Sequence, residues 1–79
     1  MKYVIFSYYD LNNPYTGCYI AEGKYRVNGE QYAVTTESLN DAKKYTSKAR
    51  AENAARKLCT SCVNLDNYEV VEVEFDLSN

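Results

Sequence analysis

The chain has 79 residues and a formal net charge of −2, with 46% hydrophobic and 25% charged residues. This length supports one small domain over residues 1–79, and the aromatic content argues against a disordered tail. The longest apolar run, residues 3–6, is far shorter than the roughly 20 residues of a membrane span, and it is too short for a secretory signal. We therefore expect a single cytoplasmic domain that does not contact a membrane.

The first third of the chain predicts strands. Residues 2–9 are dense in aromatic and β-branched types and contain neither Gly nor Pro. Residues 10–17 predict a loop, because Asn, Pro and Gly are concentrated there. Residues 18–27 then alternate as a second strand, with one face holding Tyr19 and Tyr25 and the other holding charged residues.

The strongest local signal is the pair Asn28-Gly29. Both residues accept a positive φ angle, so they suit the two-residue type I′ turn of a β-hairpin. Residues 30–36 return as a third strand. The N-terminal half is therefore predicted to be a three-stranded antiparallel meander.

Residues 39–62 have a helical pattern, but their apolar positions do not share one face. At about 100° per residue, those of the first half and those of the second half fall on nearly opposite sides of a helix. A break at Thr46-Ser47 removes this conflict, and Ser47 is a suitable N-cap. We predict a short helical turn at about 39–45, opened by a capping box at Ser38, and a main helix at about 48–59 whose buried side carries alanine.

The last predicted element is a strand over residues 68–75, in which valines alternate with Glu72 and Glu74. The element order is β-β-β-α-β, which predicts an α+β fold with the helix packed on one face of the sheet. Because a helix precedes it, the last strand is free to run parallel to its neighbour, so a mixed sheet stays open.

Nine tyrosines are the most distinctive feature of the composition, against two phenylalanines and no tryptophan. A tyrosine ring can lie half in a core and half in water, and recognition surfaces use it often. Four tyrosines are predicted to lie in the core or at its rim, opposite the alanine-faced helix: Tyr3, Tyr19, Tyr25 and Tyr32. Three flank the predicted loop and are expected to be more exposed, either as plain packing or as part of a protein-binding patch: Tyr8, Tyr9 and Tyr15.

The chain has three cysteines: Cys18, Cys59 and Cys62. This odd number agrees with a reducing compartment. The C-x-x-C pair lies at the end of the predicted helix, where the helix dipole disfavours a thiolate. We expect three small buried hydrophobic side chains, with neither metal nor cofactor. The alternative is a metal site on these three cysteines, which would need a carboxylate or a second chain to complete it.

Catalytic motifs are not recognisable in the sequence. The chain has no histidine, so the commonest general base and every Ser–His or Cys–His pair are absent. Its three glycines are scattered and do not form a phosphate-binding loop. We therefore predict a protein that is not an enzyme.

Charge is distributed unevenly along the chain. Residues 41–57 hold a surplus of Lys and Arg, whereas residues 66–76 hold acids and no base. The two segments either neutralise each other by packing side by side or form separate basic and acidic faces. Four basic residues are candidates for contact with a nucleic-acid backbone: Lys43, Lys44, Arg50 and Lys57. A solvated helix face is the preferred explanation for them, because the domain as a whole is acidic.

The layout as a whole resembles small proteins encoded by phages and prophages of Gram-positive bacteria. The resemblance lies in the tyrosine-rich meander, the segment from Asp41 to Leu58 and the final strand beginning Tyr68-Glu-Val-Val-Glu-Val. Such proteins include anti-CRISPR proteins, which bind and inhibit a host defence protein. The resemblance implies a phage or mobile-element protein located in the host cytoplasm, and it carries over no functional residue.

The preferred sequence-based hypothesis is a non-enzymatic protein that binds and inhibits a host protein, such as a nucleic-acid-processing CRISPR effector. Its partner-binding residues would be aromatic anchors and an acidic last strand: Tyr8, Tyr9, Tyr15, Glu69, Glu72, Glu74 and Asp76. The first alternative is a small nucleic-acid-binding accessory protein that uses the basic helix. The second is a structural homodimer subunit, in which a sheet edge pairs with its copy.

Overall fold

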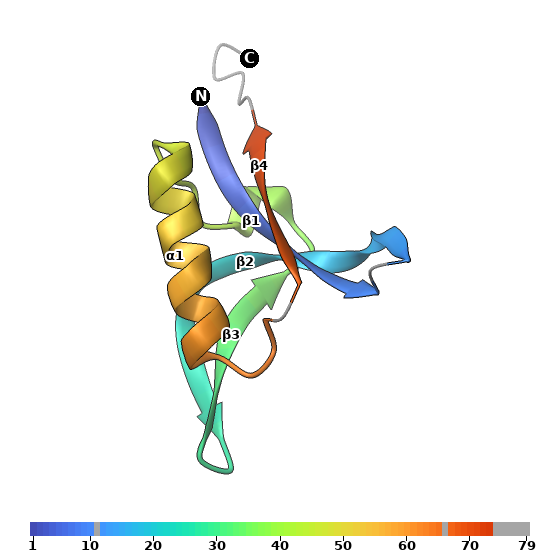
Figure 1. Ribbon diagram of the computed structural model, residues 1–79, viewed down its shortest axis with the longest axis vertical. Coiled ribbons are helices and arrows are strands. Elements are labelled where there is room, and N and C mark those ends of the chain that lie inside the picture. Colours follow the sequence, from blue (N-terminus) through green and yellow to red (C-terminus); the bar gives the residue numbers. More distant parts are fainter. Residues whose placement is uncertain (11, 66, 74–79) are drawn as a thin grey trace.

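The computed structural model describes residues 1–10, 12–65 and 67–73; the side chains of residues 9, 10 and 13–15 lie outside this description. Its elements are β1 (Lys2–Asp10), β2 (Asn13–Val27), β3 (Glu30–Thr36), the 3-10 turn η1 (Leu39–Asp41), α1 (Lys48–Ser61) and β4 (Tyr68–Val73). The four strands form one sheet in the order β3-β2-β1-β4, and α1 packs on one of its faces (Figure 1). The predicted α+β fold with β-β-β-α-β order is confirmed.

All neighbouring strands of the sheet are antiparallel, so the mixed sheet left open by the sequence is not formed. β4 comes after α1 in the chain and pairs with β1 on the side away from β2, so that Phe6 lies opposite Glu69 and Tyr3 opposite Glu72. Strand β2 is longer than predicted and begins at Asn13, which pairs with Asp10. The predicted loop over 10–17 is therefore wrong in length, because strand pairing continues across most of it.

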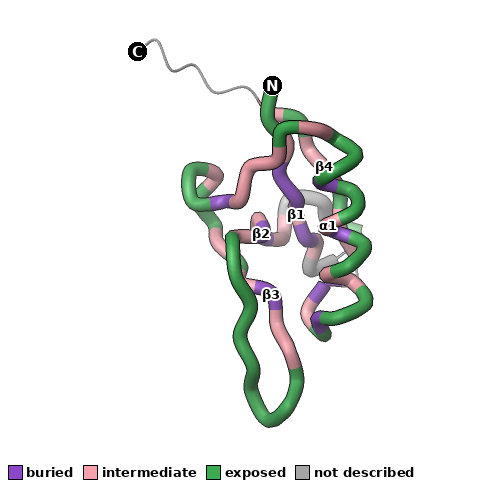
Figure 2. Tube along the Cα trace, turned by 90° about the vertical axis from the view of Figure 1, so that its left-hand side faces the viewer, coloured by how far each residue is buried: buried purple, intermediate pink, exposed green. Residues whose placement is uncertain are grey.

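Strand β2 leaves β1 at a large irregularity between Ile20 and Lys24, where Gly23 has a φ of +104°. Beyond it, β2 and β3 continue as a two-stranded arm, and residues 22–30 are all exposed (Figure 2). The arm ends in the predicted Asn28-Gly29 turn, where both residues have the positive φ of a type I′ hairpin.

The segment between η1 and α1 occupies the place beside β1 that β2 has left. Tyr45 exchanges both backbone hydrogen bonds with Tyr3, at 2.9 and 2.8 Å, and the Lys43 N–H donates to the Ile20 carbonyl at 3.1 Å. The predicted helical turn over 39–45 is thus wrong beyond Asp41, because strand pairing satisfies these backbone groups instead. The predicted capping box also fails, since the Ser38 side chain makes no cap hydrogen bond.

Helix α1 begins as predicted, with the Ser47 hydroxyl accepting from the Arg50 N–H at 3.2 Å. It ends at Ser61, two residues later than predicted. Ala51 and Ala55 are fully buried under it, which confirms its alanine face. They let the helix approach the sheet closely.

The core under the helix is aliphatic rather than tyrosine-rich. Its buried residues include Ile5, Ile20, Ala33, Ala55 and Leu65, with Tyr45 and Tyr68 packed against them. The predicted role of Tyr19 and Tyr25 as partners of the helix is wrong. Tyr25 lies on the exposed arm, 48% accessible, and Tyr19 alternates with the buried Ile20 and so faces away from α1.

The outer edge of β3 is covered by the loop that follows α1. The side chain of Asn64 accepts from the Ala33 N–H at 2.9 Å and donates to the Ala33 carbonyl at 3.0 Å. The Val63 N–H donates to the Gln31 carbonyl at 2.9 Å. Asn64 therefore imitates a neighbouring strand at an edge that would otherwise offer unpaired backbone groups.

Candidate functional site

The candidate site is a basic groove between α1 and the extended segment 43–46, and it consists of two adjoining hollows. The loop-side hollow, of about 500 Å³, is lined by residues 43–46 and by Arg50, Asn53, Ala54 and Lys57 of the helix. The strand-side hollow, of about 490 Å³, is lined by residues 21–24 of β2 and also by Leu58. The two share Lys43, Tyr45, Ala54 and Lys57, so they adjoin and form one groove.

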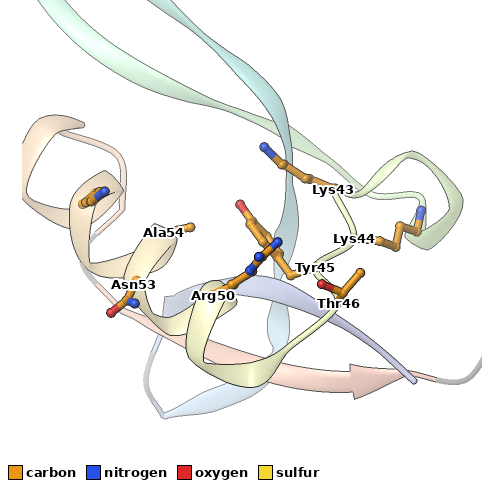
Figure 3. Close-up of a pocket in the computed structure, with 8 residues that line it drawn as sticks. Lys43, Lys44, Tyr45, Thr46, Arg50, Asn53 and Ala54 are labelled. Atoms are coloured by element: carbon orange, nitrogen blue, oxygen red, sulfur yellow. The ribbon is translucent and has the colours of Figure 1, made fainter.

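The backbone that carries the groove's segment side is firmly held. Lys43 and Tyr45 are fixed by their pairing with β2 and β1, and the Lys44 ammonium donates to the Asn40 carbonyl. Figure 3 shows the Tyr45 ring projecting from this segment toward the helix, where Arg50 and Ala54 face it. The strand pairing therefore aims the Tyr45 ring at the space beside α1, whereas the Lys44 side chain points away from that ring, toward the Asn40 carbonyl (Figure 3).

Positive charge dominates the groove. Five of the chain's nine basic residues line it, accompanied by one acid: Lys24, Lys43, Lys44, Arg50, Lys57 and Glu22. Lys43 pairs with Glu22 at 3.6 Å, but Glu22 is 81% exposed, so this pair is worth at most about 1 kcal/mol. Within the described part of the chain, Arg50 and Lys57 have no carboxylate at ion-pair distance. The groove thus holds more positive than negative charge, and an anionic ligand would neutralise this excess.

Tyr45 lies at the centre of this charge. The Lys43 ammonium is 5.4 Å from the centroid of the Tyr45 ring, within the range of a cation–π contact. Burial raises the pKa of Tyr45, and the negative charge of Glu22 raises it further. Tyr45 therefore keeps a neutral hydroxyl at physiological pH and presents a ring, not a charge, to the groove.

The four basic residues predicted from the sequence all line the loop-side hollow: Lys43, Lys44, Arg50 and Lys57. The sequence reasoning missed Tyr45 as a member of the site. Only the pairing of Tyr45 with Tyr3 places its ring beside the groove. The sequence Lys43-Lys44-Tyr45 holds no local signal of that pairing.

The predicted protein-binding residues are only partly brought together. The Tyr8 hydroxyl donates to the Glu69 carboxylate, and this hydrogen bond raises the pKa of Tyr8. Glu69 and Glu72 fall on opposite faces of the sheet, because β4 alternates between Phe6 and Tyr3 as partners. Glu69 and Glu72 therefore do not form one acidic surface. Four further residues or their side chains lie outside the described part: Tyr9, Tyr15, Glu74 and Asp76.

The face of the sheet opposite the helix carries a small aromatic cluster. Phe6 packs edge to face on both Tyr8 and Tyr19, with ring centroids 5.1 Å apart in each pair. Gly17 lies under Phe6, since a Cβ there would stand 2.8 Å from the ring and collide with the Ser7 carbonyl. The close packing of the Phe6 ring thus depends on a glycine.

Cys59 and Cys62 have free thiols, and Cys18 and Cys62 are buried. Among the residues that the structure describes, no three His, Cys, Asp or Glu side chains are grouped as metal ligands. The alternative metal site on Cys18, Cys59 and Cys62 is therefore not assembled. Across residues 1–10, 12–65 and 67–73, no helix has the length and apolarity needed to cross a bilayer.

Comparisons with known proteins add nothing to this geometry. No protein-family model, curated protein or solved structure matches the chain. A functional conclusion therefore depends on the groove and the sheet face alone.

Proposed function

We propose that this protein is a non-enzymatic binding protein whose basic groove holds the phosphate backbone of a nucleic acid. The observation that carries the proposal is that Lys43, Lys44, Arg50 and Lys57 all line one hollow of about 500 Å³. Lysine and arginine side chains that neutralise phosphates supply most of the affinity of such contacts. The sequence alternative of a nucleic-acid-binding accessory protein is thus the function that the geometry supports best.

The net charge of −2 does not oppose this proposal at contact distance. At physiological ionic strength, charges are screened beyond a Debye length of about 8 Å. Glu69 of β4 does not line the groove; it lines a separate hollow together with Lys48 and Arg56 of α1. A phosphate in the groove meets the local cations, with Glu22 as the one acid beside it.

The test is binding of a fluorescein-labelled oligonucleotide, measured by fluorescence anisotropy over a range of salt concentrations. Four phosphate contacts on a single strand predict a slope of log K against log salt of about −3. Lys57→Glu should weaken binding and make the slope less negative by about 1. Arg56→Glu is the matched control, because Arg56 is the exposed neighbour of Lys57 on α1 but lines the separate hollow beside Glu69.

Equal losses from the two variants would show a general effect of helix charge and would refute the groove. Absence of binding at low salt would refute the function altogether. Circular dichroism spectra of both variants should match that of the unchanged protein, since both positions are exposed.

A second candidate is the protein-binding function predicted from the sequence, a phage or mobile-element inhibitor of a host protein. The Phe6, Tyr8 and Tyr19 cluster supports it, together with the Tyr8–Glu69 hydrogen bond on the sheet face that α1 leaves uncovered. Aromatic anchors are typical centres of protein interfaces. Tyr8→Ala with Glu69→Lys should abolish capture of a host protein from lysate, whereas Lys57→Glu should not; the reverse pattern would reject this surface.

A further inference from the structure

The two hollows of the groove differ in their chemistry. The loop-side hollow has four cations and no acid. In the strand-side hollow, Glu22 neutralises part of the charge of Lys43, and small or apolar residues contribute much of the wall, among them Ala21, Gly23 and Leu58. The strand-side hollow also holds Lys24 and Lys57, so a phosphate group is favoured more strongly on the loop side, where no acid lines the wall, than on the strand side, where Glu22 does.

Tyr45 lines both hollows. Its ring packs against the core on one side, which fixes it, and it carries no charge at physiological pH. An aromatic ring beside a cationic track is the arrangement by which proteins stack the bases of a single strand while holding its phosphates. The strand-side hollow has the volume and the apolar wall that a planar ring needs.

We infer that the strand-side hollow takes an unstacked nucleobase against Tyr45, so that the ligand of the groove is single-stranded nucleic acid. This inference rests on the proposed function, and it adds a class of ligand to it. The phosphates of the strand lie along the loop-side cations, where no acid lines the hollow, and the base occupies the strand-side hollow, where Glu22 offsets part of the positive charge. A duplex does not fit this arrangement, because its bases stay stacked inside and cannot enter a recess.

The shape of the groove supports the same conclusion. Proteins that read a duplex insert a protruding helix or ribbon into one of its grooves. Here the cations line a recess between α1 and the segment 43–46, and the Tyr45 ring lies within it (Figure 3). The exposed arm of β2 and β3 does protrude. Its Tyr25 and Tyr32 rings, however, are stacked on each other, with their centroids 5.4 Å apart.

The test compares three fluorescein-labelled probes of 12 positions each: single-stranded oligothymidylate, an abasic strand with the same phosphates, and a duplex. The single strand should bind about tenfold more tightly than either of the others, the effect expected when one base stacks on an aromatic ring. Equal binding of the abasic and the thymidine strands would overturn the base subsite and leave the phosphate-binding function standing. If none of the three probes bound, both the base subsite and the phosphate-binding function would be overturned.

Two variants locate the subsite. Ala21→Leu fills the strand-side hollow and should remove the preference for bases while leaving binding of the abasic strand unchanged. Ala49→Leu is the matched control, because Ala49 is exposed on α1 outside both hollows. Glu22→Lys, at an 81% exposed position, should instead tighten binding of the abasic strand and so reduce the preference. An unchanged preference in both Ala21→Leu and Glu22→Lys would contradict the subsite.

Discussion

Asn64 is predicted to stabilise the whole sheet by covering the edge of β3. Its half-buried side chain exchanges two hydrogen bonds with the backbone of Ala33, at 2.9 and 3.0 Å, and Ala33 itself is fully buried. A hydrogen bond of this kind contributes about 1 kcal/mol net. Asn64→Ala removes both bonds and leaves the N–H and carbonyl of Ala33 without these partners.

The expected loss is therefore about 2 kcal/mol in the free energy of unfolding. For a domain of this size, that corresponds to a fall in Tm of roughly 8–16 °C. Thermal and urea unfolding followed by circular dichroism measure both quantities. The free energy of unfolding of Asn64→Asp should lie between those of the unchanged protein and of Asn64→Ala, because a carboxylate still accepts from the Ala33 N–H but no longer donates to the Ala33 carbonyl.

Asn53→Ala is the matched control, since Asn53 is exposed on α1 and its loss should change stability by less than about 0.5 kcal/mol. If Asn64→Ala were as stable as Asn53→Ala, the loop after α1 would not be holding the edge of β3. The assignment of Asn64 as a substitute for a neighbouring strand would then be wrong.

Two further predictions concern the helix contact and the sheet face. Ala55→Leu should destabilise the protein by about 1–3 kcal/mol, because Ala55 is fully buried among the core residues. Ala49→Leu, on the exposed side of α1, should leave stability unchanged. Equal Tm values for the two variants would contradict the packing of α1. Glu69→Gln should lower the pKa of Tyr8 toward its ordinary value, because the hydrogen bond to the Glu69 carboxylate raises it; an NMR titration of the tyrosine rings measures this, and an unchanged titration would reject the contact. Since the folded-state pKa is the raised one, stability from this contact is complete below the ordinary tyrosine pKa of about 10 and is lost as pH rises through the folded value.

Local signals in the sequence predicted the elements that local chemistry controls. Asn28 and Gly29 accept positive φ angles wherever they occur, and they form the turn. Ser47 caps the helix because its hydroxyl reaches a backbone N–H three residues later. The alanine face of α1 follows from helical spacing alone.

Long-range pairing decided the features that the sequence could not predict. Residues 42–45 are extended because Tyr45 pairs with Tyr3, which is distant in sequence, and no local pattern reports such a partner. The faces of Tyr19 and Tyr25 depend on which side of β2 the helix covers. The buried residues Ile20 and Ala33 lie on the covered side, so Tyr19 and Tyr25, which alternate with Ile20 along β2, lie on the other side.

In the candidate site too, local signals predicted some residues and long-range pairing decided others. The four groove cations were recognisable as a group because they cluster in sequence and, in part, along one helix. Their ranking below the protein-binding hypothesis followed from the acidic composition, which says nothing about where charges gather in space. Tyr45 and the recess around it became visible only once the extended segment was paired with β1.

The most direct test of the central claim is an NMR titration of ¹⁵N-labelled protein with single-stranded oligothymidylate. The account predicts amide shift changes confined to the groove, at residues 21–24 of β2, at Lys43–Thr46 and along the Arg50–Lys57 side of α1. Changes at Phe6, Tyr8 and Tyr19 on the opposite sheet face, with the groove unaffected, would contradict it.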